Sequence, residues 1–244
     1  MSFLNDFVLL LKARYPIIYI STYEEERIEY IIKYCTKKYV SRAYYAWDFI
    51  DGYQGNPNDT GFAARNPLEA LELIEKLTPE TPAVFVLRDY DNFLKDLSVT
   101  RKIKNLSKTL KTQPKNIIII SNEVNIPDPL KEIITVVDFP LPSYSEIQEE
   151  LKRLMDSIKQ EISIKDISSL TIACQGLSLE RIRRVLSKII AQYGKIDKFS
   201  ASLILEEKKQ IIQQSQILDF CVPDKNASDL GGLDIFKEWL QLRQ

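Results

Sequence analysis

The sequence predicts an α/β fold in which a parallel sheet is followed by an all-helical part. Over residues 1–141, short runs that are apolar throughout alternate with amphipathic segments of helical length. This alternation is typical of a parallel sheet whose two faces are covered by helices. The strand pattern then ends, and residues 142–220 carry only helical periodicity. Residues 221–244 form a third, short segment with a Gly-Gly pair.

Five apolar runs predict the buried strands of the sheet. They lie at residues 16–21, 42–47, 83–87, 116–121 and 133–139. Runs of this length, apolar on both sides, are expected where a strand is covered on both faces.

The segments between the strands have helical periodicity. They predict helices at about 24–38, 67–77 and 92–110, the second with Pro67 at its first position. Residues 51–61 (DGYQGNPNDTG) are predicted to form a loop, because Gly, Asn, Pro and Asp cluster there.

The all-helical part is predicted to contain four helices. They span residues 145–158, a stretch from about 163, residues 178–193, and a stretch from about 200. The third helix carries an apolar stripe wide enough to need more than one neighbour. Its members are Ile182, Val185, Leu186, Ile189 and Ile190.

Composition limits the chemistry of the 244-residue chain. It contains no histidine, which excludes Ser-His-Asp and Cys-His catalysis and every His-ligated metal site. The three cysteines, Cys35, Cys174 and Cys221, are far apart in sequence and indicate a reducing compartment. The formal net charge is −1, so nucleic acid is not an expected partner unless a local patch binds it. The apolar run 7–11 is too short to span a bilayer.

The turn after the first predicted strand is where a phosphate-binding loop would lie in a P-loop-like fold. The sequence there, STYEEERIEYII, has neither the glycines that let backbone N–H groups surround a phosphate nor the lysine that reaches it. Thr22 and Glu25 instead have the spacing of a capping box. The carboxylates of residues 24–26 would repel a triphosphate from the start of the helix.

The end of the third predicted strand lacks the acidic pair that holds Mg²⁺ in such folds. Arg88 occupies the metal position and Asp89 follows it. Asn122 follows the fourth strand, where a γ-phosphate sensor would lie. We expect no catalytic residue and no metal ligand here, and only weak candidates for nucleotide binding, Asp89 and Asn122. The alternative is structural: Asp89 and Asp91 cap a turn, and Asn122 caps a strand end.

Residues 95–115 carry seven cations and one acid. They predict either a solvated helix face or a surface for nucleic acid or another anionic partner.

The final segment, DLGGLDIFKEWLQLRQ, resembles the lead-in to an AAA ATPase core. Together with STYEEERI, CQGLSLERIRRVLSKIIA and MSFLNDFVLLLKARYPIIYI, it makes the chain resemble the N-terminal half of the AAA-domain-containing ATPases of cyanobacteria and algal plastids, the family of the hypothetical chloroplast open reading frame forty-six. The resemblance implies three parts. They are a degenerate AAA-like domain without a Walker A motif (1–141), a helical lid (142–220), and a linker with the start of a second AAA module (221–244).

The resemblance also implies a working ATP site, with ATP and Mg²⁺, in the second module, a homo-oligomer in the full-length protein, and the plastid stroma or cyanobacterial cytoplasm as its location. This chain is then expected to be a non-catalytic module for assembly or partner binding, without a cofactor of its own and without ATPase activity. Two alternatives stay open: an unorthodox nucleotide site at Asp89 and Asn122, or an anionic partner bound by residues 95–115. The segment Leu230–Gln244 is expected to be disordered in this chain or to pack on a second copy.

Overall fold

The computed structural model describes residues 3–55, 61–158, 160, 163–197 and 200–214. These residues form two compact units, the first running to Ser143 and including Ser178–Glu180, the second comprising Tyr144–Leu177 and the chain from Arg181. Each unit is described by itself. The predicted linker 221–244, with Cys221 and the predicted tail segment Leu230–Gln244, lies outside the described residues.

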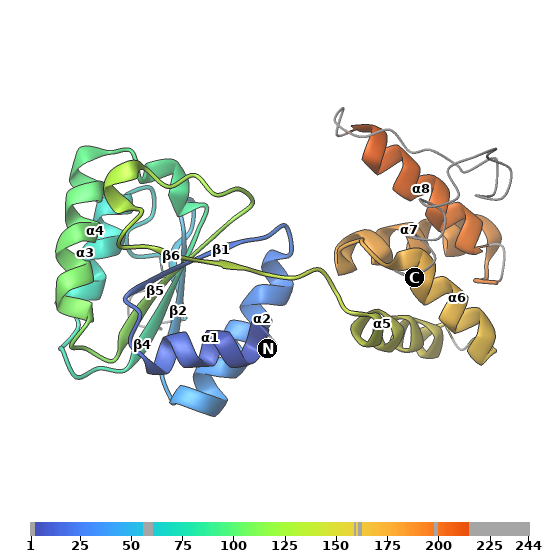
Figure 1. Cartoon of the computed structure of the whole chain (residues 1–244), viewed down its shortest axis with the longest axis horizontal. Coiled ribbons are helices and arrows are strands. Elements are labelled where there is room, and N and C mark those ends of the chain that lie inside the picture. The colour runs from blue at the N-terminus through green and yellow to red at the C-terminus, as the bar shows by residue number, and fades with distance from the viewer. Residues whose placement is uncertain (1–2, 56–60, 159, 161–162, 198–199, 215–244) are drawn as a thin grey trace, which may run out of the picture. The chain divides into compact units, whose positions relative to one another are not determined.

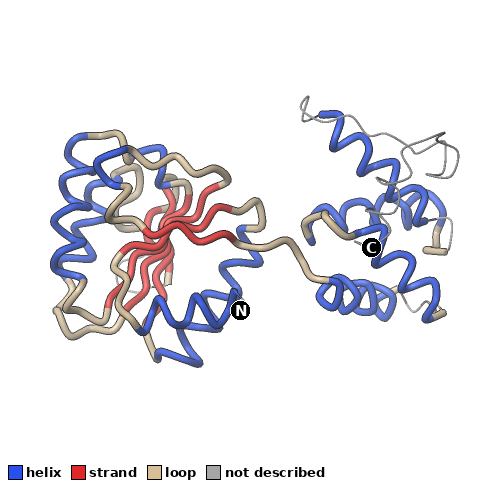
Figure 2. The backbone as a smooth tube through the Cα atoms, viewed as in Figure 1, coloured by secondary structure: helices blue, strands red, loops and turns tan. Residues whose placement is uncertain are grey.

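The first unit is built around a six-stranded sheet with the order β3-β2-β4-β5-β1-β6. The strands are β1 (Ile17–Ser21), β2 (Ala43–Asp48), β3 (Gly52–Gln54), β4 (Ala83–Arg88), β5 (Lys115–Ser121) and β6 (Thr135–Asp138). All pair in parallel except β3, which pairs antiparallel with β2 at one edge. The predicted α/β class with a largely parallel sheet is therefore confirmed, and Figure 2 shows the strands in red.

Helices cover both faces of this sheet (Figure 1). The four long helices of the first unit are α1 (Phe3–Lys12), α2 (Glu25–Cys35), α3 (Pro67–Lys76) and α4 (Leu97–Leu110). Helices α1 and α2 pack on one face and α3 and α4 on the other, so two apolar cores form, one on each side of the strands.

Strand alternation divides the apolar side chains between the two cores. In β1, Ile17 and Tyr19 belong to the core under α3 and α4, whereas Ile18 and Ile20 belong to the core under α1 and α2. All four are fully buried. Because successive side chains of a strand point to opposite faces, a strand covered on both sides must be apolar throughout, which is why these runs were recognisable in the sequence.

Helix α1 was not predicted. Its sequence, FLNDFVLLLK, contains the apolar run that was considered only as a membrane-span candidate. In the structure Phe7, Val8 and Leu11 are buried against the sheet at helical spacing. Within the described residues no helix is long and apolar enough to cross a membrane.

The loop predicted at 51–61 was wrong at its start, since Gly52–Gln54 form β3 and pair with β2. Gly52 has a φ of +69°, and a Cβ there would lie 2.5 Å from the carbonyl oxygen of Phe62. A glycine is therefore required for this edge strand to turn back onto β2. The helix predicted at 92–110 is also divided, into a 3₁₀ turn at Tyr90–Phe93 and α4, which begins after Asp96.

The second unit contains α5 (Tyr144–Ser157), α6 (Ile164–Cys174), α7 (Leu179–Tyr193) and α8 (Ser200–Gln214). All four helices were expected from the sequence. Of the stripe predicted on α7, Ile182, Val185, Leu186 and Ile189 are buried, and Ile190 is half-buried.

Replacement of Leu186 by Asp tests the packing of the helical unit. Leu186 is 1% exposed. Truncation of a core leucine alone costs about 2–5 kcal/mol, so the charged replacement is expected to cost about 3 kcal/mol or more of unfolding free energy. The measurement is urea unfolding followed by circular dichroism. Leu205→Asp on α8, where the side chain is 45% exposed, is the matched control and should cost much less. Equal losses for the two variants would contradict this packing.

Candidate functional site

The turn between β1 and α2 is short and contains no glycine. Only Thr22, Tyr23 and Glu24 separate the strand from the helix. The backbone N–H of Thr22 donates to the carbonyl oxygen of Ser121 at 2.8 Å, which continues the pairing of β1 with β5. The Thr22 hydroxyl accepts a hydrogen bond from the N–H of Glu24 at 3.0 Å. The chain therefore enters the helix directly and forms no wide loop of N–H groups of the kind that surrounds a phosphate.

The predicted capping box between Thr22 and Glu25 was wrong. The N-cap residue is Glu24, and no side chain caps the helix start. A capping box needs the N–H of Thr22 to be available to Glu25, but the sheet already uses it. The Glu25 carboxylate lies instead 3.5 Å from the guanidinium of Arg88.

Glu24 is also paired within the domain. Its carboxylate lies 2.5 Å from the guanidinium of Arg27, which donates to the carbonyl oxygen of Pro140 at 2.8 Å. The same guanidinium lies 4.4 Å from the ring centroid of Phe139. A negative charge therefore stands at the positive end of α2, and the chain's own cation holds it there.

Arg88, the last residue of β4, lies at the centre of a cluster of carboxylates. Its Nε donates to Glu29 of α2 at 2.5 Å, and its Nη1 donates to Asp48, at the end of β2, at 3.2 Å. The more distant Glu25 makes a third ion pair. The side chains of Arg88 and Glu29 are only 18% and 8% exposed, so solvent screens this pair little. We call these four residues the Arg88 cluster.

The shifts in pKa follow from this arrangement. Burial opposes ionisation of Glu29, but the hydrogen bond and charge of Arg88, with those of Lys33, outweigh it and lower the pKa of Glu29. The hydrogen bond with Glu29 raises the pKa of Arg88 despite burial. Burial raises the pKa of Glu25, although Arg88 opposes this effect. At neutral pH the arginine is therefore charged and held by an ionised Glu29.

The Arg88 cluster lies at the end of β4, where the sequence predicted the metal position of a P-loop-like fold. The sequence predicted a cation, Arg88, at that position. In the structure its charge is neutralised, and the carboxylates that face it are engaged as acceptors. A metal ion would have to displace a guanidinium from Glu29 and Asp48 before it found a ligand. Within the described residues, no group of three or more acidic or cysteine side chains could hold a metal ion.

The two weak candidates for nucleotide binding follow neighbouring strands at the carboxyl edge of the sheet. Asp89 has a φ of +49° and donates its N–H to the carbonyl oxygen of Ile120 at 2.9 Å. Burial, and then the charge of Asp91, raise the pKa of Asp89. Asn122 is exposed, and its backbone carbonyl oxygen accepts a hydrogen bond from Ser21. Asp91 is 6% exposed, and its Oδ1 makes no hydrogen bond.

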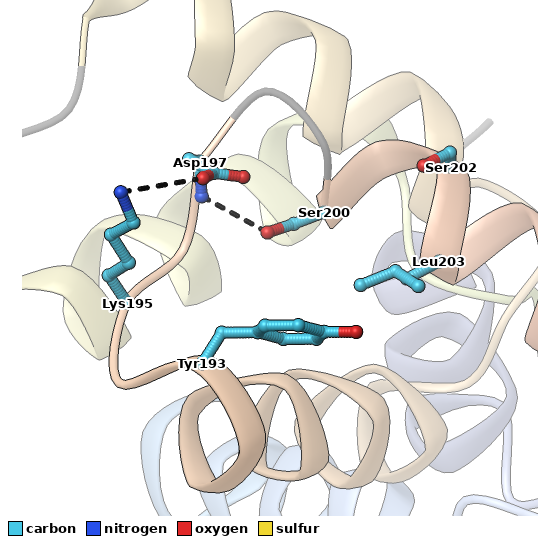
Figure 3. A pocket seen from close by; sticks show the side chains of 6 residues that line it. All are labelled: Tyr193, Lys195, Asp197, Ser200, Ser202 and Leu203. Carbon is cyan, nitrogen blue, oxygen red and sulfur yellow. Dashed lines mark hydrogen bonds and ion pairs between the residues drawn. The ribbon is translucent and has the colours of Figure 1, made fainter.

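A cavity of about 340 Å³ lies in the helical unit (Figure 3). It is lined by Tyr193, Lys195, Asp197, Ser200, Ser202 and Leu203. The hydroxyl of Ser200 accepts a hydrogen bond from the N–H of Asp197 at 3.0 Å, and Lys195 lies 3.8 Å from the Asp197 carboxylate. These contacts engage Ser200, Asp197 and Lys195 with one another at the start of α8, as in an ordinary helix cap.

The sheet order and the elements around it define an AAA-type α/β domain. The chain is similar in fold to the FIGL-1 AAA domain solved in complex with ADP, with a TM-score of 0.55 and 11% identity over 96% of this chain and 84% of that one. It is equally similar, at 0.55 and 10% identity, to a chain of the HORMA:CdnC:Trip13 complex of E. coli MS115-1, over 84% of this chain and 83% of that one. At such identities the likeness concerns the fold alone.

The family follows from the sequence comparison. The SpoVK-like AAA ATPase N-terminal domain matches residues 3–139, and the second domain of the same family matches residues 145–215. The chain belongs to the SpoVK-like AAA ATPase family.

Curated relatives support the same assignment. The chain is 55%, 53% and 51% identical to uncharacterized AAA domain-containing proteins named ycf46 from Trieres chinensis, Guillardia theta and Pyropia yezoensis, in each case over 100% of its own length. It spans about half the length of these relatives, 49%, 48% and 49%. The resemblance stated from the sequence is therefore confirmed.

Two residues of the Arg88 cluster were missed from the sequence. Glu29 lies on the buried side of α2, one turn after Glu25, among isoleucines that predicted an apolar face. Asp48 ends β2 in the segment next to the predicted loop. An acid at a buried helical position is the signal that could have found Glu29, because such a residue needs a cation as partner.

Replacement of Arg88 by Met tests the cluster. The variant leaves the buried Glu29 with only the exposed Lys33 as an ionic partner, and we expect a loss of about 2–3 kcal/mol at pH 7.5, somewhat less than for a fully buried pair. The pKa of Glu29 is lower in the folded wild type than in the unfolded chain, so ionised Glu29 stabilises the folded wild type at pH values above its unfolded pKa. This stabilisation is lost as the pH falls through the folded pKa. In the variant, burial raises that pKa and only Lys33 opposes the increase. The difference between the two proteins should therefore shrink below about pH 5.

The measurement is urea unfolding of both proteins between pH 3.5 and 7.5. Arg88→Met combined with Glu29→Gln is the companion variant, because it removes the unpaired charge and should recover part of the loss. A difference that stays constant across this pH range, with no recovery in the double variant, would show that the pair contributes through packing alone.

Proposed function

We propose that this chain is the N-terminal, non-catalytic part of an AAA ATPase, and that it serves assembly or the binding of a partner protein. The observation that carries the proposal is the Arg88 cluster. The guanidinium of Arg88 pairs with three carboxylates of the chain itself at the predicted metal position, and the β1–α2 turn offers no glycine-rich loop to a phosphate.

The remaining parts of the proposal concern the longer protein. Since the chain spans about half of its curated relatives, we place ATP binding and hydrolysis, with ATP and Mg²⁺, in a second AAA module beyond the residues matched here. The residues 142–220 act as a lid, and the full-length protein assembles as a homo-oligomer through its AAA modules. The ycf46 relatives favour the plastid stroma as its location.

One observation favours a second candidate, a nucleotide site of unusual construction at the carboxyl edge. Asp91 is buried with one carboxylate oxygen that lacks a hydrogen bond, and Asp89 and Asn122 lie at the ends of adjacent strands nearby. A polar group that is buried and unpaired is costly, and a ligand would relieve that cost. We rank this candidate second because a nucleotide bound there would find no glycine-rich loop and no lysine in the β1–α2 turn.

Isothermal titration calorimetry with Mg-ATP separates the two candidates. We expect no saturable one-to-one binding of Mg-ATP with a micromolar dissociation constant to this chain. Arg88→Asp, checked for folding by circular dichroism, should not create binding, because the β1–α2 turn still offers no glycine-rich loop and no lysine. The companion variants Asp89→Asn and Asn122→Ala show whether any heat that is observed comes from the carboxyl edge.

A micromolar isotherm that both companion variants abolish would establish the unusual nucleotide site and reject the non-catalytic proposal. A micromolar isotherm that these variants leave unchanged would reject both candidate functions, because Mg-ATP would then bind this chain at a place other than Asp89 and Asn122.

A further inference from the structure

The two edges of the parallel sheet differ in charge. The segments that lead into β1, β2 and β5 meet at the amino edge of the sheet. These segments and the residues next to them contain no acidic residue over residues 8–16, 30–47 and 97–115. The loops after β1, β2 and β4 lie at the carboxyl edge and carry the acids of the site described above. At the amino edge the acids are Glu80 before β4 and Glu132 before β6.

Two arginines at this amino edge are held by neutral groups of the domain. Arg14, just before β1, donates from Nη1 to the carbonyl oxygen of Thr112 at 2.9 Å. Arg42, just before β2, donates to the side-chain oxygen of Asn116 on β5. The amide nitrogen of Asn116, which is fully buried, donates in turn to the carbonyl oxygen of Tyr15 at 2.7 Å. The buried amide therefore links the Arg42 guanidinium to the backbone that leads into β1.

Neither arginine is paired with a carboxylate in the part of the chain that the structure describes. Arg42 is half-buried, and burial, with the nearby positive charge of Arg14, lowers its pKa. Half-buried cations in folded proteins are normally compensated by acids, as Arg88 is at the opposite edge. The two guanidiniums are close enough to repel one another, and neither is paired with an acid of the domain. They therefore attract an oxyanion from another molecule.

The surface beside Arg42 adds cations and tyrosines. Lys37 and Lys38 lie in the π-helical turn Thr36–Val40 that leads to Arg42, and both are exposed. The Nζ of Lys38 lies 4.9 Å from the ring centroid of Tyr34 and 5.5 Å from that of Tyr39. The two rings also meet edge to face at 5.9 Å.

This arrangement favours a protein over a single-stranded nucleic acid as the ligand. Nucleic acids of that kind stack their bases on open aromatic faces. Here Tyr34 packs edge to face against Tyr39, and the Nζ of Lys38 donates a hydrogen bond to the Tyr34 hydroxyl, so both rings are already engaged by neighbouring side chains of the chain itself. Tyrosine and arginine are, in contrast, the residues most enriched in the energetic centres of protein interfaces.

We propose that the amino edge of the sheet, with Arg14 and Arg42 at its centre and Lys37 and Lys38 beside them, is a docking surface for an acidic segment of a partner protein. The two guanidiniums bind carboxylates of the segment, and the lysines steer its approach. This inference deepens the proposed role in partner binding and rests on it, but it assigns that role to the edge opposite the Arg88 cluster.

The experiment uses the full chain and a fluorescein-labelled peptide of six Glu-Ser repeats. In a buffer of low ionic strength we expect a dissociation constant below about 100 μM that weakens steeply as salt is added. Arg14→Gln combined with Arg42→Gln should weaken binding roughly tenfold. The control Arg65→Gln combined with Arg153→Gln makes the same change of charge at two exposed arginines and should leave the dissociation constant within about twofold of the wild type.

Further arms separate the alternatives. Arg14→Gln alone, at an exposed residue, keeps the test valid if loss of Arg42 disturbs folding, which circular dichroism reports. A Gln-Ser peptide of equal length should not bind. Tighter binding of a twelve-nucleotide oligouridylate than of the Glu-Ser peptide, no binding of the Glu-Ser peptide up to 1 mM, or equal weakening by the control pair would each overturn the proposal. Mg-ATP binding is measured separately, so failure of this surface and failure of the non-catalytic assignment give different results.

Discussion

The ion pair between Arg88 and Glu29 is the interaction on which the organisation of the first unit's carboxyl edge depends. It joins the end of the central strand β4 to α2, and the bond from Arg88 to Asp48 extends it to the end of β2. Breaking this pair is expected to cost about 2–3 kcal/mol, which is a substantial part of the stability of an ordinary domain. A domain fixed in this way cannot open its carboxyl edge to a ligand without losing a substantial fraction of its stability.

The short turn at Thr22 belongs to the same constraint. Because α2 must bring Glu29 and Glu25 to Arg88, the helix has to begin immediately after β1, and a turn of three residues allows this. A phosphate-binding loop needs several residues with free N–H groups at the same place. The N–H of Thr22 and the N–H of Glu24 are instead bonded to Ser121 and to the Thr22 hydroxyl. The β1–α2 turn can therefore either place α2 for the Arg88–Glu29 ion pair or form a phosphate-binding loop, but it cannot do both.

The sequence predicted the fold better than it predicted the site, for physical reasons. The central strands β1, β4 and β5 are buried on both faces and are apolar over most of their length, and so they were recognisable from the sequence alone. The edge strand β3 was missed because its glycine and polar residues are typical of loops, and pairing with β2 overrides that preference. The capping box failed because local spacing cannot reveal that the N–H of Thr22 is used by β5. Glu29 and Asp48 lie 59 and 40 residues from Arg88, a separation that no local pattern bridges.

The two edges of the sheet differ in whether their charged side chains are paired with opposite charges of the domain. At the carboxyl edge acids lie near the strand ends, as in many α/β proteins that bind ligands there, but Arg88 pairs with three of them, Glu25, Glu29 and Asp48. At the amino edge the half-buried Arg42 rests on the amide of Asn116, which orients the guanidinium without cancelling its charge. Since a neutral acceptor leaves the electrostatic attraction for anions intact, this edge keeps the capacity to recognise another molecule. A carboxyl edge closed by the Arg88 cluster and the docking surface that we propose at the amino edge are thus compatible within a single sheet, because its opposite edges belong to different ends of the same strands.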